Sequence, residues 1–215
     1  MELVSIKAKN RLEDGVFKAE FADGTSFLFS INYLNNITDF SQWEEGKELS
    51  PLEEDSLLFA AACYRAEKIA LRLIARAEQS SLALTAKLEK RGTGAGVVRA
   101  VISRLTDREL LDDARYAELW VRSRLGNYRG IRPGSKRRAL SPLWFLVSLG
   151  KRGIDRASSL SAIGKVLDEE TEYALLLKYL EETDALEGEG RSYLKTHLKR
   201  EGFSSGTIER FFETI

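Results

Sequence analysis

The sequence of 215 residues contains one cysteine, one histidine and three prolines. A single cysteine, Cys63, cannot form an internal disulfide or build a cysteine-based zinc site, so we expect it to be a small core residue. No segment approaches the roughly 18 uncharged apolar residues of a membrane-spanning helix, and the N-terminus does not resemble a signal peptide. We therefore expect no membrane contact and a cytoplasmic location.

The sequence also lacks a recognisable catalytic or cofactor site. The glycine-rich run 92–96 follows a helical pattern and has no Gly-Lys-Ser/Thr ending, which disfavours a phosphate loop; Thr93 is better interpreted as the cap of the next helix. His197 has no second histidine or cysteine with which to bind a metal. Asp112 and Asp113 are explained by the start of a helix. The sequence predicts a binding protein that is not an enzyme, with no catalytic residue, metal or cofactor.

The net charge is zero, but charge is unevenly distributed along the chain. Residues 1–60 carry 5 basic and 12 acidic side chains, residues 61–156 carry 21 and 9, and residues 157–215 carry 7 and 12. Within 115–156 there are eleven basic residues and two acidic ones. Such a segment favours binding to a polyanion or an acidic protein surface, although a solvated basic face is the commoner origin of a charge run. Aromatic residues within the run favour the binding interpretation.

The first 49 residues predict a small antiparallel sheet. Short apolar alternations are separated by Glu13-Asp14-Gly15 and Asp23-Gly24, and Asp-Gly between such runs is a hairpin signal. Because a sheet of three short strands is marginal alone, we expect it to pack against the first helix. That helix is predicted to begin at Ser50-Pro51-Leu52-Glu53, a capping box, and to reach about Glu78 with Leu58 and Ala62 on its buried face.

A helical signature occurs three times in the rest of the chain. Two apolar residues four apart are followed, four residues later, by a glycine with Lys-Arg near it: the glycines are Gly92, Gly153 and Gly202. In each case the glycine can adopt the left-handed conformation that ends a helix. Helical patterns precede and follow each signature, which indicates units of three helices that are best stacked on their neighbours.

The predicted fold is therefore mainly α, with tandem three-helix repeats in an elongated curved array and a small N-terminal antiparallel β-sheet. The predicted parts are a β domain (1–49), a first repeat (50–110), a second repeat (111–165) with a basic insertion (126–140), and a third repeat (166–215).

The most specific segments of the second repeat are Leu111-Asp112-Asp113-Ala114-Arg115-Tyr116-Ala117 and Val121-Arg122-Ser123-Arg124. Together with Ser141-Pro142 and Lys151-Arg152-Gly153-Ile154, they resemble the RecX regulatory proteins, which modulate the RecA recombinase. The resemblance covers residues 51 to 215, strongly to 125. The chain departs from the family at Leu143-Trp144-Phe145-Leu146, where arginine-rich positions are usual. The basic contacts are therefore expected to include the insertion.

The resemblance implies that the protein binds in the groove of a RecA filament on single-stranded DNA. ATP hydrolysis, strand exchange and repressor cleavage in the SOS response are then restrained, and with them homologous recombination and DNA repair. We expect a monomer. The candidate contacts to RecA or DNA are Arg115, Arg122, Arg124, Arg129, Arg132, Lys136, Arg137, Arg138, Lys151 and Arg152. Tyr116 and Trp120, one turn apart, are interpreted as core residues rather than contacts.

A rival interpretation is a DNA-binding protein that acts without RecA, because tandem helical units with basic faces can also bind single-stranded or duplex DNA. A third is an inert scaffold with a solvated basic face. An effect on RecA ATP hydrolysis distinguishes the first interpretation from the other two.

Overall fold

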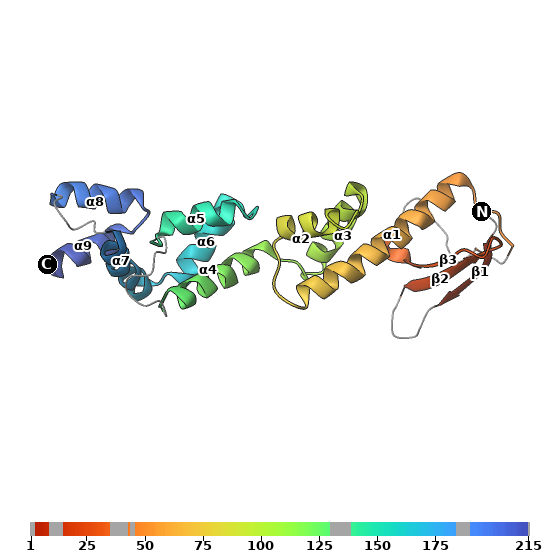
Figure 1. Cartoon of the computed structure of the whole chain (residues 1–215), viewed down its shortest axis with the longest axis horizontal. Helices are drawn as coiled ribbons and strands as arrows, with labels where there is room; N and C mark the ends of the chain where they lie inside the picture. The colour runs from red at the N-terminus through yellow and green to blue at the C-terminus, as the bar shows by residue number, and fades with distance from the viewer. Residues whose placement is uncertain are drawn as a thin grey trace. The chain divides into compact units, whose positions relative to one another are not determined.

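The computed structural model describes residues 3–8, 15–34, 43, 46–129, 139–183 and 190–214, with only the backbone described at 3–8 and 127–129. Within these residues the chain is mainly helical and has a three-stranded antiparallel sheet near its N-terminus (Figure 1). The predicted fold class is confirmed. None of the helices described is both long enough and apolar enough to cross a membrane.

The sheet has the order β1 (Leu3–Ala8), β2 (Val16–Phe21) and β3 (Ser26–Ser30). Ile6 pairs with Ala19, which pairs in turn with Phe27. The Asp23-Gly24 turn joins β2 to β3, with Gly24 at a φ of 82°. As predicted, the sheet packs on the first helix, where Ala19 and Phe29 share one core with α1.

Helix α1 (Pro51–Ile74) begins with the predicted capping box between Ser50 and Glu53. It ends four residues earlier than expected, because the chain must leave the helix before the Ser80 cap of α2. The predicted buried face was wrong at Leu58 and only partly buried at Ala62, whereas Ala66, on the same predicted face, is buried. Leu57 is fully buried whereas Leu58 is 43% exposed, because the helix must satisfy both the sheet and α3. Cys63 is buried as predicted.

The following helices are α2 (Ser81–Glu89), α3 (Ala95–Asp107), α4 (Asp113–Arg129), α5 (Pro142–Gly150) and α6 (Arg156–Val166). The prediction that Thr93 caps α3 was wrong. Gly94 occupies the cap position with extended backbone and has no side chain to cap the helix, while Thr93 belongs to the turn after α2, where its amide donates to the Leu88 carbonyl at 3.3 Å.

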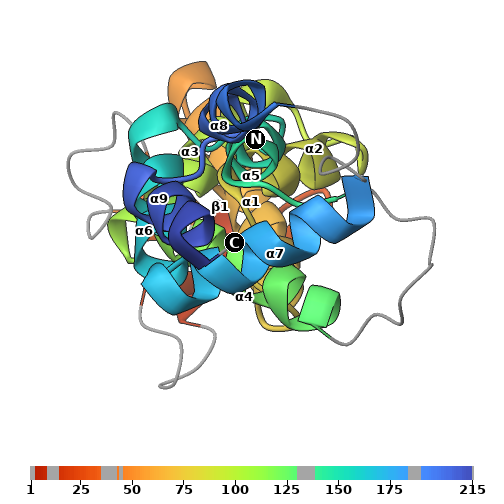
Figure 2. The same cartoon turned by 90° about the vertical axis from the view of Figure 1, so that its left-hand side faces the viewer.

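The last helices, α7 (Glu169–Thr183), α8 (Arg191–Arg200) and α9 (Ser205–Thr214), lie at the C-terminal end of the chain (Figures 1 and 2). Three signature turns follow α2, α5 and α8, at Gly92, Gly153 and Gly202. Their φ angles are 79°, 82° and 88°. In each turn the amide after the glycine donates to a leucine carbonyl five residues earlier, at 3.2–3.3 Å. The predicted helix-ending role of all three glycines is confirmed.

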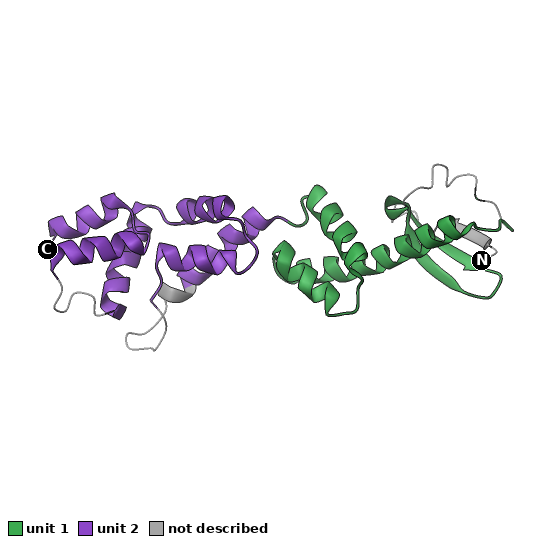
Figure 3. Ribbon diagram, turned by 90° about the horizontal axis from the view of Figure 1, so that it is seen from above, with its two compact units in different colours: residues 1–111 green, residues 112–215 purple. Residues whose placement is uncertain are grey.

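The contacts group the chain into two units, residues 1–111 and 112–215 (Figure 3). The sheet and α1–α3 share the core of unit 1, and α4–α9 share the core of unit 2. The finer division into a β domain and three repeats, and their curved array, stay predictions.

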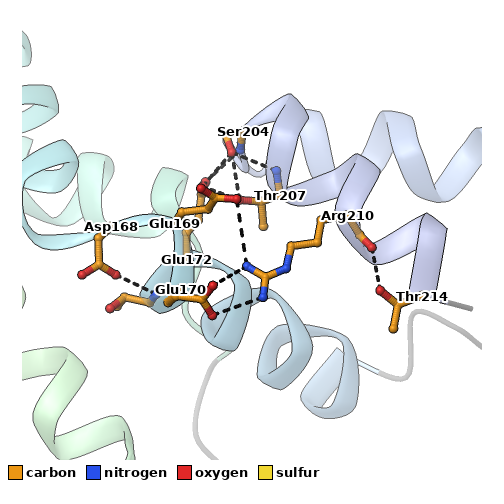
Figure 4. A network of polar contacts seen from close by, with 9 residues as sticks. Asp168, Glu169, Glu170, Glu172, Ser204, Thr207, Arg210 and Thr214 are labelled. Carbon is orange, nitrogen blue, oxygen red and sulfur yellow. Dashed lines mark hydrogen bonds and ion pairs between the residues drawn. The ribbon is translucent and has the colours of Figure 1, made fainter.

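Polar contacts join α7 to α9 within unit 2 (Figure 4). Glu172 accepts hydrogen bonds from the Ser204 amide and hydroxyl and from the Thr207 hydroxyl, at 2.7–2.8 Å. Arg210 forms two hydrogen bonds to Glu170 and lies 4.3 Å from the Tyr173 ring centroid. The N-terminal ends of α7 and α9 are therefore tied to each other.

Candidate binding surface on helices α4 and α5

Helix α4 carries the first candidate contacts, and Asp112 sets where it begins. The Asp112 carboxylate accepts hydrogen bonds from the amides of Ala114 and Arg115, at 2.8 and 2.9 Å. It also lies 3.8 Å from the Arg115 guanidinium. Arg115 is therefore half-buried and engaged at the helix start, while Arg122 and Arg124 are exposed.

The core face of α4 consists of Ala117, Val121 and Leu125. Tyr116 and Trp120, interpreted from the sequence as core residues, are only partly buried and pack against the edge of this core. The prediction was off by one position around the helix. Tyr116 and Trp120 are spaced by four residues, and so are Ala117, Val121 and Leu125, so spacing alone does not distinguish the two faces. Packing against α5 and α6 places the face with the smaller side chains in the centre of the core.

The arginines of α4 do not share one face. Arg115 and Arg122 are seven residues apart and lie on nearly the same side, whereas Arg122 and Arg124 are separated by about 200° around the helix. Among the described residues, Arg122 has no ion pair or hydrogen bond through its side chain. A single flat partner surface therefore cannot contact all three arginines at once.

Arg124 from α4 and Arg152 from the turn after α5 converge on one aromatic ring. Their guanidinium carbons lie 5.3 and 4.3 Å from the centroid of Trp120. The indole of Trp144 stacks against Trp120, with centroids 5.7 Å apart and 19° between planes, and Phe145 meets both indoles edge-on. We call Trp120, Arg124, Trp144 and Arg152 the Arg-Trp cluster.

The cluster holds its cations in place. Arg152 donates from Nη1 to the Ser148 carbonyl at 2.6 Å, which uses part of its donor fork, and its contact with Trp120 contributes about 0.5–1 kcal/mol. The two acids nearest in sequence have other partners: Glu118 pairs with Lys165 at 2.5 Å, and Asp155 accepts the Ser158 amide hydrogen at 3.0 Å. Two planar guanidinium groups with remaining donors can bind a carboxylate or a phosphate.

The other candidate residues are distributed differently. Lys151 is exposed beside Arg152. Arg129 belongs to α4 by its backbone, and its side chain is not described. Arg132, Lys136, Arg137 and Arg138 lie outside the described residues. The contact roles of all ten residues stay predictions.

Sequence reasoning counted the aromatic residues of the basic run in favour of binding but missed that Trp120 and Trp144 stack together beneath the arginines. Trp120 precedes Arg124 by four residues, a spacing that places a ring beneath a cation on one helix. The partner on α5 had no comparable signal, because Trp144 is 24 positions away and only the fold brings it close.

The other groups considered from the sequence are held in structural contacts. Burial raises the pKa of the Cys63 thiol to about 12, which keeps it protonated and unreactive. His197 lies 3.0 Å from the Tyr179 hydroxyl and stacks on Tyr193. Among the residues that the structure describes, no three histidine, cysteine, aspartate or glutamate side chains gather in a group that could hold a metal ion.

No protein-family model matches the chain. Curated relatives do match it, among them two regulatory proteins. The regulatory protein RecX of Treponema pallidum (strain Nichols) is 35% identical over 155 residues, covering 72% of this chain and 88% of the relative. The regulatory protein RecX of Thermobifida fusca (strain YX) is 33% identical over 150 residues, covering 68% of this chain and 76% of the relative.

Solved structures resemble the fold, among them two crystal structures. A crystal structure of regulatory protein RecX matches with a TM-score of 0.63 and 20% identity, over 97% of both chains. The crystal structure of RecX from Lactobacillus salivarius matches with a TM-score of 0.51 and 19% identity, over 71% of this chain and 96% of that chain. These likenesses support the architecture.

Proposed function

The chain belongs to the RecX family of regulatory proteins, and on that premise we propose that it binds, as a monomer, to the RecA filament on single-stranded DNA. Binding inhibits ATP hydrolysis by RecA, strand exchange and RecA-assisted repressor cleavage. In this role the chain catalyses no reaction, because its binding to the filament is enough to inhibit RecA.

The Arg-Trp cluster is the observation that supports this proposal best. It gathers two candidate cations, one from α4 and one from the turn after α5, at one place, with Trp120 half-buried beneath them. Preorganised guanidinium groups lose less side-chain entropy on binding a carboxylate or phosphate than extended surface arginines do. A filament of protein on DNA offers both kinds of anion.

The test is a pair of double variants with equal charge change. Arg124→Glu with Arg152→Glu removes the cluster, and Arg91→Glu with Arg99→Glu alters exposed arginines in unit 1. We expect the first variant to require about tenfold more protein to halve RecA ATP hydrolysis on single-stranded DNA, and the second less than about twofold more. Thermal unfolding followed by circular dichroism verifies that both are folded.

Two results would contradict the proposal. One is a wild-type protein that leaves RecA ATP hydrolysis unchanged but binds naked DNA tightly and in a salt-dependent way, which would favour direct DNA binding without RecA. The other is equal inhibition by wild-type protein and the Arg124, Arg152 variant, which would leave the cluster without a role.

A further inference from the structure

A groove runs along α5 within unit 2, on the side that faces α7 and the turn after α8. Its volume is about 400 Å³. The lining residues used below are Ser141, Leu143, Val147, Lys151, Glu182 and Glu201. We call it the α5–α7 groove. Trp144 lies in its wall and also belongs to the Arg-Trp cluster, so the two sites are adjacent.

Two carboxylates line the groove, and that of Glu201 is held in place. The Ser141 hydroxyl, in a residue that is 1% exposed, donates to Glu201 at 2.6 Å. The Leu143 amide donates to the Glu201 carbonyl at 2.8 Å, which fixes the same turn through its backbone. Glu182, from the last turn of α7, lines the groove as well. A cation that enters here would meet two carboxylates.

Tyr179 also lines the groove, and its hydroxyl senses the charge of Glu201. Burial, followed by the charge of Glu201, raises the pKa of Tyr179 above its ordinary value. A charge in such a setting is screened less than one on an open surface.

The wall and the other end of the groove have a different character. Leu143 and Val147 lie one turn apart on α5 and remain 37% and 48% exposed. Lys151 follows α5, so the amine and the Glu201 carboxylate stand near opposite ends of a nine-residue helix, about 13 Å long. The groove thus offers an acidic end, an apolar middle and a basic end.

We propose that the α5–α7 groove docks a segment of a protein partner that carries a lysine or arginine next to apolar side chains. The cation binds between Glu182 and Glu201, and the apolar side chains cover Leu143 and Val147. A nucleic acid does not fit, because its phosphates would meet the two carboxylates. The identification of the partner as the protein part of the RecA filament rests on the proposed function.

Two matched pairs of variants test this docking. Glu182→Lys reverses a groove charge, and Glu181→Lys makes the same change at the adjacent, exposed position outside the lining. Val147→Asp and Leu160→Asp place an acid at positions that are 48% and 49% exposed, of which only the first lines the groove. We expect each groove variant to need about fivefold more protein for half-inhibition of RecA ATP hydrolysis, and each control less than about twofold more.

A photocrosslinking amino acid at position 147 supplies a second measurement that does not depend on reversing a charge. We expect crosslinks to RecA in assembled filaments, and about tenfold fewer from position 160. Groove variants that inhibit as well as their controls, or crosslinks from position 147 to the DNA strand instead of to RecA, would overturn the docking proposal. Because wild-type inhibition is measured in the same assay, its absence would instead count against the proposed function.

Discussion

Helices α2 and α5 share a backbone design and differ in what they present to solvent. Each has nine residues, a buried serine cap and the same Lys-Arg-Gly turn. The arginine of each turn donates to the carbonyl four residues earlier, Arg91 at 2.7 Å and Arg152 at 2.6 Å. Equivalent positions are fully buried in both: Leu84 and Leu88 in α2, Phe145 and Leu149 in α5.

The difference lies in a few positions of the outer face. Where α2 has Ala83 and Ala86, α5 has Trp144 and Val147. Arg152 therefore lies over Trp120 beside a second indole, whereas no aromatic ring of the described residues lies under Arg91. The same helix and turn are thus inert in one unit and a candidate site in the other. The serine caps and Lys-Arg-Gly turns that set the backbone are thus different residues from those that set the outer surface of each helix.

The largest effect that we predict concerns the turn glycines. Alanine at Gly92 meets no atom within 4 Å and costs only the left-handed conformation, about 1 kcal/mol. At Gly202 an added methyl would also lie 3.2 Å from the Leu143 nitrogen and 3.3 Å from Pro142 Cβ, so Gly202→Ala should cost about 3 kcal/mol. Urea unfolding followed by circular dichroism measures both, and equal losses would show that α5 yields without strain.

The next prediction converts the outer face of α5 toward that of α2. Trp144→Ala removes the indole that stacks on Trp120, so unit 2 should lose about 1 kcal/mol and the exciton band of the stacked indoles in the far-ultraviolet circular dichroism spectrum should disappear. Val147→Ala, the control on the same helix, should keep the band. Persistence of the band in Trp144→Ala would mean that the two indoles are not its source.

The smallest predicted effect concerns Glu53, which lies three residues after the serine cap of α1. The same position holds Ala83 in α2 and Trp144 in α5, so only α1 has a carboxylate there. The Lys47 ammonium, followed by the amide and hydroxyl of Ser50, lowers the pKa of Glu53 from 4.5 to about 2. The charged carboxylate therefore stabilises the fold fully above its unfolded pKa. This stabilisation is lost as the pH falls through the range from 4.5 toward 2.

Because the Glu53 side chain is only partly shielded, the effect should stay below about 1 kcal/mol. Unfolding free energies of wild type and Glu53→Gln, measured between neutral and acidic pH, should differ most at neutral pH and converge in acid. A constant difference across this range would contradict the assignment.

Local signals in the sequence predicted most of the backbone. The Ser50-Glu53 box, the Asp23-Gly24 turn and the three signature glycines each act within a few residues, so their effect can be inferred without the fold. Phase around α1 and α4 could not be predicted, because Leu57 and Val121 are selected by helices and strands that pack on them from elsewhere in the chain.

The candidate site was predicted less completely for the same reason. A count of basic residues found Arg124 and Arg152, but treated them as equal to Arg122, which lies on another side of α4. Arg124 and Arg152 differ from Arg122 because they share the Trp120 indole, and that contact depends on how α5 lies against α4.

The third signature turn differs from the other two in the sign of one residue. Where the first two turns have Arg91 and Arg152 before the glycine, the third has Glu201, which accepts the Ser141 hydroxyl hydrogen. An arginine side chain has no acceptor atom, so it could not accept this hydrogen. The turn after α8 can therefore seat on the start of α5 in a way that the turns after α2 and α5 cannot. A single acid-for-base exchange of this kind favours one pairing of turn and helix over the alternatives, which works against swapped assemblies of the same chain.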